Sequence, residues 1–210
     1  MGTRATKPVT RPRKYALLIG INYLGTTSQL TECVNDVAKV RKILIDKYKF
    51  GASNITLLND HTFAKPTRQN ILSEMQKLAQ KAKTDDIIYI HYSGHGSRLV
   101  DRSGDEADGY DEVIVPLDFE RSACISDDEI RRILCAAFTA GVKVRIVLDC
   151  CHSGTACDLK YVLDEGANII ESKYAETAAD VILISGCRDA QVSLEDQSGG
   201  MLTTSYLETL

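Results

Sequence analysis

Two short segments of this 210-residue chain carry reactive side chains directly after apolar, strand-like runs. One segment is His91–Gly96 and contains His95, and the other is Asp149–Gly154 and contains Cys151. A cysteine nucleophile requires at least a nearby histidine, because the imidazole can take up the thiol proton. The carboxyl ends of parallel strands meet at one edge of a sheet, so we expect His95 and Cys151 to lie close together. The two segments therefore predict a cysteine hydrolase.

The roles within this pair follow from the local pattern. Cys151 lies beyond its strand, at a tight turn that Gly154 can form, whereas Cys150 should point the opposite way and pack under the sheet. His95 would act as general base toward the thiol and then as general acid toward the leaving amine. The N–H groups of Gly96 and Cys151 would form an oxyanion hole. No third residue that would orient His95 is evident from the sequence.

Other uses of these side chains are weaker hypotheses. Buried cysteines are most often inert core residues, but the histidine and the flanking glycines argue against that reading of both thiols. His91 is expected to have a structural role, and His152 should point away from its neighbour Cys151 in an extended segment. A redox sensor built on Cys150 and Cys151 lacks a Cys-x-x-Cys motif. The spacing of Cys151 and Cys157 does not resemble a zinc ligand pair.

The composition is that of an ordinary globular protein, with 44% hydrophobic residues and a net charge of −4. The negative balance argues against a nucleic-acid binder, and no apolar run approaches the roughly 20 residues that span a bilayer. Seven scattered cysteines favour reduced thiols and a cytoplasmic setting. The basic residues 1–13 are expected to form a disordered tail.

Strand-like and helix-like segments alternate along the rest of the chain. Strands are expected at residues 15–20, 55–58, 86–92, 143–149 and 180–186, and helices at residues 35–48, after Pro66 and after Ser126. The last helix opens with a capping box, because Ser126 is followed three residues later by Glu129. This alternation predicts an α/β three-layer sandwich, with a mostly parallel central sheet flanked by helices.

At these segments the chain resembles a type I metacaspase, a member of the caspase-like cysteine peptidases. The matching segments occur in the family's order and are Tyr15–Tyr23, Cys33–Val37, Tyr92–Gly96, Tyr110–Glu112, Asp149–Gly154 and Ile184–Cys187. The resemblance implies one caspase-like peptidase domain over residues 14–210, with His95 and Cys151 as the catalytic dyad. It also implies a monomer that cleaves protein or peptide substrates after arginine or lysine, and not after aspartate as caspases do.

A basic substrate side chain requires acidic groups in the pocket that receives it. Asp149 lies two residues before the nucleophile, and Asp36 lies near the start of the first helix. Two converging carboxylates would bind a guanidinium or ammonium group through charge-assisted hydrogen bonds. The resemblance places both in the substrate pocket, with Cys33 and Ser93 lining it. Taken alone, Asp36 would instead be read as a partner of the helix dipole.

The resemblance also implies an activating calcium ion. Its ligands would be Asp111, Asp127, Asp128 and Asp158. Calcium takes six to eight oxygen ligands, but the spacing here is unlike an EF-hand, and acidic runs are usually solvated loops or helix starts. The expected role of Ca²⁺ is to neutralise carboxylates that repel each other and to order the loop after Cys151.

The chain departs from the family pattern in two places. Cys150 stands where relatives commonly have serine, and the chain stops soon after Thr203, so the small-subunit part is expected to be incomplete. If the substrate cleft is incomplete, the chain would not cleave peptides. The alternative function is therefore a caspase-like interaction module without proteolysis. By the inferred specificity, Lys160 and Lys173 are possible positions of self-cleavage.

Overall fold

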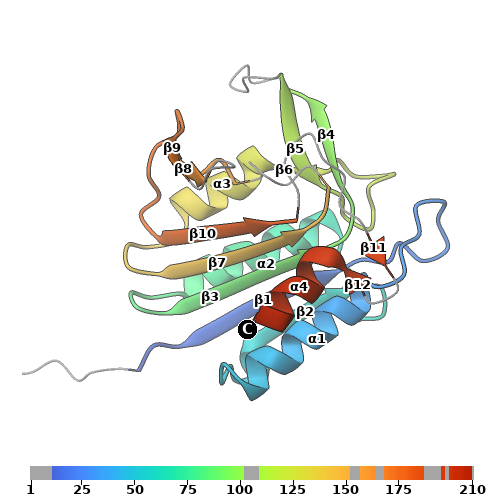
Figure 1. Cartoon of the computed structure of the whole chain (residues 1–210), viewed down its shortest axis with the longest axis horizontal. Helices are drawn as coiled ribbons and strands as arrows, with labels where there is room; N and C mark the ends of the chain where they lie inside the picture. The colour runs from blue at the N-terminus through green and yellow to red at the C-terminus, as the bar shows by residue number, and fades with distance from the viewer. Residues whose placement is uncertain are drawn as a thin grey trace, which may run out of the picture.

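The computed structural model describes residues 11–101, 109–151, 157–163, 168–186, 195–196 and 199–209. The predicted basic tail therefore lies mostly outside the described residues. At the centre is a five-stranded parallel sheet in the order β10-β7-β3-β1-β2 (Figure 1). Its strands, in chain order, are β1 (Lys14–Gly20), β2 (Ile55–Asn59), β3 (Ile87–Ser93), β7 (Lys143–Asp149) and β10 (Asp180–Ser185). All five strands expected from the sequence are present.

Helices cover both faces of this sheet, as Figure 1 shows. Helices α1 (Cys33–Asp46) and α4 (Met201–Thr209) pack on one face, against alternate strand residues such as Leu18 and Val147. Helices α2 (Arg68–Lys81) and α3 (Asp127–Ala136) pack on the other face. Strand residues alternate between the two cores because successive side chains point to opposite faces. The predicted three-layer α/β sandwich is confirmed.

Local sequence signals explain where two helices begin. The Ser126 hydroxyl accepts a hydrogen bond from the N–H of Glu129 at 3.3 Å, which confirms the predicted start of α3. The Thr67 hydroxyl accepts from the N–H of Asn70 at 3.3 Å and caps α2 in the same way. Helix α1 begins at Cys33, two residues before the predicted start, without a side-chain cap.

Several short elements have no counterpart in the sequence prediction. An antiparallel sheet comprises β4 (Gly96–Val100), β5 (Tyr110–Ile114) and β6 (Ile125–Ser126) and stands beyond the carboxyl end of β3 (Figure 1). The remaining elements are the pair β8 (Tyr161–Leu163) and β9 (Ile169–Glu171), the pair β11 (Glu195–Asp196) and β12 (Gly199–Gly200), the short helix η1 (Ala52–Asn54) and α4. No helix within the described residues is long and apolar enough to cross a membrane.

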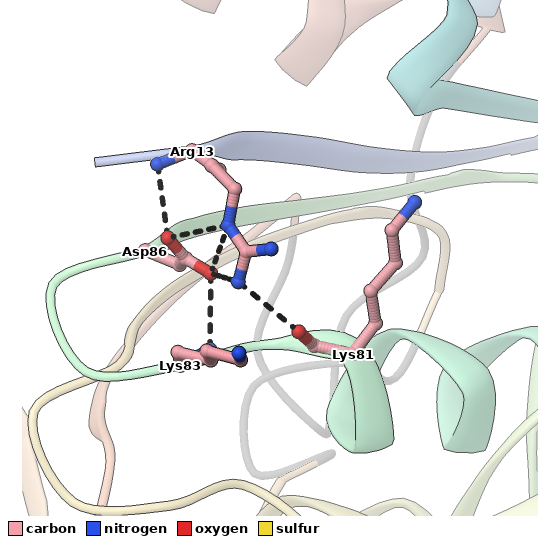
Figure 2. Close-up of polar contacts among 4 residues, drawn as sticks. All are labelled: Arg13, Lys81, Lys83 and Asp86. Atoms are coloured by element: carbon pink, nitrogen blue, oxygen red, sulfur yellow. Dashed lines mark hydrogen bonds and ion pairs between the residues drawn. The ribbon is translucent and has the colours of Figure 1, made fainter. Parts of the chain in front are cut away.

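The amino ends of β1 and β3 are joined by a clasp between Arg13 and Asp86 (Figure 2). The Asp86 carboxylate accepts from the backbone N–H and the guanidinium of Arg13, at 2.9 and 2.7 Å, and from the N–H of Lys83 at 3.0 Å. Burial raises the pKa of Asp86, but these hydrogen bonds outweigh it, and the net pKa is lowered. The clasp fixes the end of the sheet opposite the segments that carry His95 and Cys151.

Candidate active site

Neighbouring strands place the two reactive segments side by side. Strands β3 and β7 pair in parallel, with Ser93 opposite Asp149. His95 and Cys151 each lie two residues beyond that pair. The N–H of Gly94 donates to the carbonyl oxygen of Asp149 at 3.4 Å, so the two segments stay in contact past the sheet edge.

The two segments also approach each other closely at Gly96. A Cβ atom placed on Gly96 would lie 1.9 Å from the carbonyl oxygen of Cys151 and 3.1 Å from the sulfur of Cys150. Only glycine permits this approach, because the first of these atoms belongs to the backbone. Cys151 is half-buried, whereas Cys150 is buried in the core between the sheet and α2 and α3. The predicted burial of Cys150 under the sheet is confirmed.

The imidazole of His95 has a partner that the sequence did not reveal. Its Nε2 lies 2.7 Å from the carbonyl oxygen of Ser28, in the loop between β1 and α1. A carbonyl oxygen only accepts, so Nε2 carries the proton in this contact and Nδ1 is left as the acceptor. The ring also packs on Tyr23, with the centroids 4.7 Å apart. Because the Ser28 contact uses a backbone atom, no residue type at position 28 signals it.

The four predicted pocket residues are all buried at the same edge of the sheet. Asp36 is fully buried, and its Oδ2 accepts a hydrogen bond from the Ser93 hydroxyl at 3.2 Å. Ser93 in turn stands opposite Asp149 in the sheet, and Asp149 is only 4% exposed. The ammonium of Lys39 lies 3.6 Å from the Oδ1 of Asp36. Two buried carboxylates thus flank Ser93.

Helix α1 reaches this position because its first turn abuts the end of β1. A Cβ atom on Gly20 would lie 2.4 Å from the carbonyl oxygen of Cys33 and 2.7 Å from the Val37 side chain. The glycine therefore lets the helix start directly against the strand end. This contact sets Cys33 and Asp36 beside the ends of β1 and β3.

Thr203 of α4, a residue not predicted from the sequence, contacts the pocket from the face of the sheet that α1 and α4 cover. Its N–H donates to the Oδ2 of Asp149 at 2.8 Å, and its hydroxyl lies 3.3 Å from the Nε2 of His91. His91 is fully buried, and burial lowers its pKa to about 3. The imidazole of His91 is therefore neutral near pH 7 and is held inside the protein beside Thr203.

The predicted calcium ligands are only partly brought together. Asp127 and Asp158 are 1% and 2% exposed. Burial raises the pKa of Asp127 to about 8, and the nearby charge of Asp158 contributes to this increase. Glu112, which sequence reasoning missed, is buried beside them, and its N–H donates to the Oδ2 of Asp127 at 3.0 Å. Asp111 and Asp128 are half-buried.

These residues do not form a complete coordination shell. Among the residues that the structure describes, no three or more histidine, cysteine, aspartate or glutamate side chains are grouped so that they could hold a metal ion. The buried pair Asp127 and Asp158 nevertheless fits a cation, because two like charges out of water are costly unless a proton or a cation neutralises them. Residues 102–108, with Asp105, Glu106 and Asp108, lie outside the described part.

The segment after the nucleophile is braced by Arg131 of α3. Its guanidinium donates to the carbonyl oxygens of Asp158 and Ala175 and lies 4.7 Å from the centre of the Tyr174 ring. The two candidate self-cleavage positions lie in this region, where Lys160 pairs with Glu171 at 3.2 Å and Lys173 lies over the Tyr174 ring. Residues 152–156, which include His152 and Gly154, lie outside the described residues.

Comparisons with known proteins give this arrangement a family. The model of the metacaspase peptidase C14 domain matches residues 14–160. Metacaspase-1 of Cryptococcus neoformans is 42% identical over 193 residues, which are 90% of this chain and 41% of that protein. Metacaspase-1B of Neurospora crassa is 41% identical over 174 residues, which are 81% of this chain and 41% of that protein. The chain thus spans about two fifths of the length of these relatives.

Solved structures agree with the fold. A protein from Geobacter sulfurreducens superposes with a TM-score of 0.71 at 27% identity, covering 94% of this chain and 81% of that one. Caspase-1 from Spodoptera frugiperda superposes with a TM-score of 0.60 at 15% identity, covering 98% of this chain and 75% of that one, and supports the fold alone. By its sequence match and its sheet, the chain belongs to the metacaspases, within the caspase-like cysteine peptidases.

Proposed function

We propose that this chain is a cysteine endopeptidase that cuts peptide bonds after arginine or lysine and is activated by calcium. The observation that carries the proposal is the approach of the His95–Gly96 backbone to Cys151, beside two buried carboxylates. Family membership supports the reaction class. The basic preference and the calcium dependence are supported by the carboxylates alone.

In the proposed reaction, the Cys151 thiolate attacks the substrate carbonyl and forms an acyl-enzyme. His95 takes the thiol proton, and it then gives a proton to the nitrogen of the departing amine. The N–H groups of Gly96 and Cys151 would bind the oxyanion, and a water molecule would hydrolyse the acyl-enzyme. The Ser28 carbonyl supports this assignment, because it fixes the proton on Nε2 and leaves Nδ1 to accept the proton of the thiol.

The preference for arginine or lysine would arise at Asp36 and Asp149. Both carboxylates are buried at the sheet edge next to the nucleophile, where a cation gains most from them. Cys33 and Ser93 would form the wall between them. Lys39 already lies near Asp36, which supports the idea that this position favours an ammonium or guanidinium group.

Calcium would bind near Asp127 and Asp158, with Asp111 and Asp128 as further ligands. When bound, the ion would supply the positive charge that lets both buried carboxylates ionise. Asp158 lies on the segment that follows Cys151, and its carbonyl oxygen is held by Arg131 of α3. With both carboxylates ionised and their charge balanced by the ion, Asp127 and Asp158 would hold the segment after Cys151 against α3. We also propose a monomer in the cytoplasm, where its thiols stay reduced.

The test is hydrolysis of two matched fluorogenic peptides, one ending in arginine and one in aspartate, with calcium and with chelator. The proposal expects cleavage of the arginine peptide alone, only with calcium, and loss of that cleavage in Cys151→Ala. Full activity of Cys151→Ala would contradict the mechanism. Mapping fragment ends after calcium addition tests self-cleavage, and cuts at neither Lys160 nor Lys173 would contradict that part.

One observation favours a second candidate function, a caspase-like interaction module without proteolysis. The N–H of Thr203 already occupies one oxygen of Asp149, which leaves less of that carboxylate for a substrate. Labelling with an arginine-directed electrophile separates the two candidates, because an interaction module need not react at Cys151. If neither peptide is cleaved and Cys151 is not labelled, the interaction module is favoured.

A further inference from the structure

Two buried phenol groups hold the backbone of His95 on both sides. The N–H of His95 donates to the hydroxyl of Tyr23 at 3.0 Å, and the hydroxyl of Tyr92 donates to the carbonyl oxygen of His95 at 2.7 Å. Both tyrosines are fully buried. The peptide groups on either side of the His95 Cα atom are therefore each fixed by a side chain.

The same two hydroxyls also bind Val115, the residue after β5. The Tyr23 hydroxyl donates to the Val115 carbonyl oxygen at 2.7 Å, and the Val115 N–H donates to the Tyr92 hydroxyl at 3.2 Å. The two hydroxyl oxygens are 3.0 Å apart. Val115 and His95 also bind each other directly, at 3.1 Å. The result is a closed cluster of two phenols and two backbone segments.

The neighbouring glycine is required by this cluster. A Cβ atom on Gly94 would lie 2.7 Å from the hydroxyl of Tyr92 and 3.1 Å from that of Tyr23. The turn before His95 is thus built around the two hydroxyls. Burial raises the pKa of both phenols, so they remain protonated and able to donate.

A purely space-filling role does not explain these hydroxyls. Phenylalanine at either position would fill nearly the same volume and would avoid the cost of burying a polar group. What the hydroxyls add is a fixed position for the His95 backbone, which carries the imidazole. The Tyr23 ring also packs on this imidazole, with the ring centroids 4.7 Å apart, while the imidazole Nε2 binds the Ser28 carbonyl oxygen.

We propose that Tyr23 and Tyr92 are positioning residues for the general base, and that their hydroxyls hold the His95 backbone so that Nε2 stays on the Ser28 carbonyl and Nδ1 stays available to the thiol. The proposal rests on the proposed function, in which His95 is that base. It adds two residues that act through His95 without touching the substrate.

The kinetic test compares Tyr23→Phe, Tyr92→Phe and the double variant with wild type on the arginine peptide. A misplacement of about 1 Å can cost about 10²-fold in rate, so we expect kcat to fall roughly 10- to 100-fold while KM stays within about twofold. The double variant should lose less than the product of the two single losses, because the two hydroxyls lie 3.0 Å apart and share Val115 as a partner, so their effects are coupled. The matched control is Tyr15→Phe, a buried tyrosine in the same core at the opposite end of the sheet.

A second measurement does not depend on catalysis. Long-range proton–nitrogen NMR spectra of ¹⁵N-histidine protein report which ring nitrogen of His95 carries the proton, with His95→Gln to assign the signal. Wild type should show the Nε2–H form alone, and the two phenylalanine variants a mixture of both forms. Thermal melts of each variant check that the fold is retained.

The two measurements also separate this proposal from the proposed function. If wild type cleaves no peptide but the variants change the His95 ring, the positioning role stands and the proposed function fails. If the phenylalanine variants keep both the wild-type kcat and a single Nε2–H form, the positioning role is overturned, whatever the substrate.

Discussion

The carbonyl oxygen of Cys151 occupies the position at which a side chain on Gly96 would begin, with only 1.9 Å between that oxygen and an ideal Cβ. Gly96→Ala should therefore push the His95 segment away from the nucleophile. Because both proposed oxyanion donors would separate, we expect kcat on the arginine peptide to fall by about 10²-fold or more. Initial rates at saturating substrate measure this loss.

The control for that variant is Gly51→Ala. Gly51 has a φ of −67°, and a Cβ there would meet its nearest neighbour, in Asn54, at an ordinary 3.6 Å. This control should keep wild-type kcat. Activity of Gly96→Ala within twofold of wild type would show that the two segments are not held as closely during catalysis.

Removal of either pocket charge should weaken the preference for basic side chains. Hydrogen bonds to charged groups contribute about 1.5–3 kcal/mol, so Asp36→Asn and Asp149→Asn should each lower kcat/KM for the arginine peptide roughly 10- to 100-fold. The matched control is Asp46→Asn, an exposed aspartate of the same α1 helix that pairs with Lys42. Unchanged kcat/KM in both pocket variants would place the specificity elsewhere.

The buried pair Asp127 and Asp158 should make apo stability depend on pH. The pKa of Asp127 is raised from 3.8 to about 8, so the folded state keeps a proton that the unfolded state releases above about pH 4. The stability due to this proton is fully present below pH 4 and is lost as the pH rises through 8. Urea unfolding in chelator should show this fall, and Asp127→Asn should flatten it. An equal slope in the variant would contradict the raised pKa.

His91 should give a pH dependence of the opposite sign. Burial lowers its pKa from 6.5 to about 3, so the unfolded state gains a proton below pH 6.5 that the folded state does not bind. Stability should therefore fall as the pH falls from 6.5 toward 3. Urea unfolding at several values in this range should show a smaller fall in His91→Gln. The exposed His61, changed to glutamine, should leave the slope as in wild type.

Local signals were sufficient to predict the sheet and most of its helices. The run at β1, the capping serine of α3 and the two segments after β3 and β7 each depend on neighbouring residues, and each is present in the structure. That the segments after β3 and β7 share one edge of the sheet was also predictable, because the carboxyl ends of parallel strands lie together. Strand order was not, since it depends on packing between segments far apart in sequence.

The parts that escaped prediction are contacts made by backbone atoms or across long separations. Ser28 binds His95 through its carbonyl oxygen, and Thr203 binds Asp149 through its N–H, so neither residue type carries a signal. Glu112 is buried where β5 pairs with β4 and lies beside Asp127 of α3, and both contacts join residues that are far apart in the sequence. Tyr23 and Tyr92 stood in recognised motifs, but a sequence does not show that their hydroxyls meet.

The position of β10 bears on what a break in the chain would do. Every residue assigned to the proposed dyad and pocket precedes Lys160, and β10 and α4 follow Lys173. Yet β10 pairs with β7 from Asp180 to Ser185, and α4 binds Asp149 through Thr203. A molecule cut between the two lysines would therefore behave as a non-covalent two-piece assembly, with its halves co-migrating in native gels and separating only in denaturant.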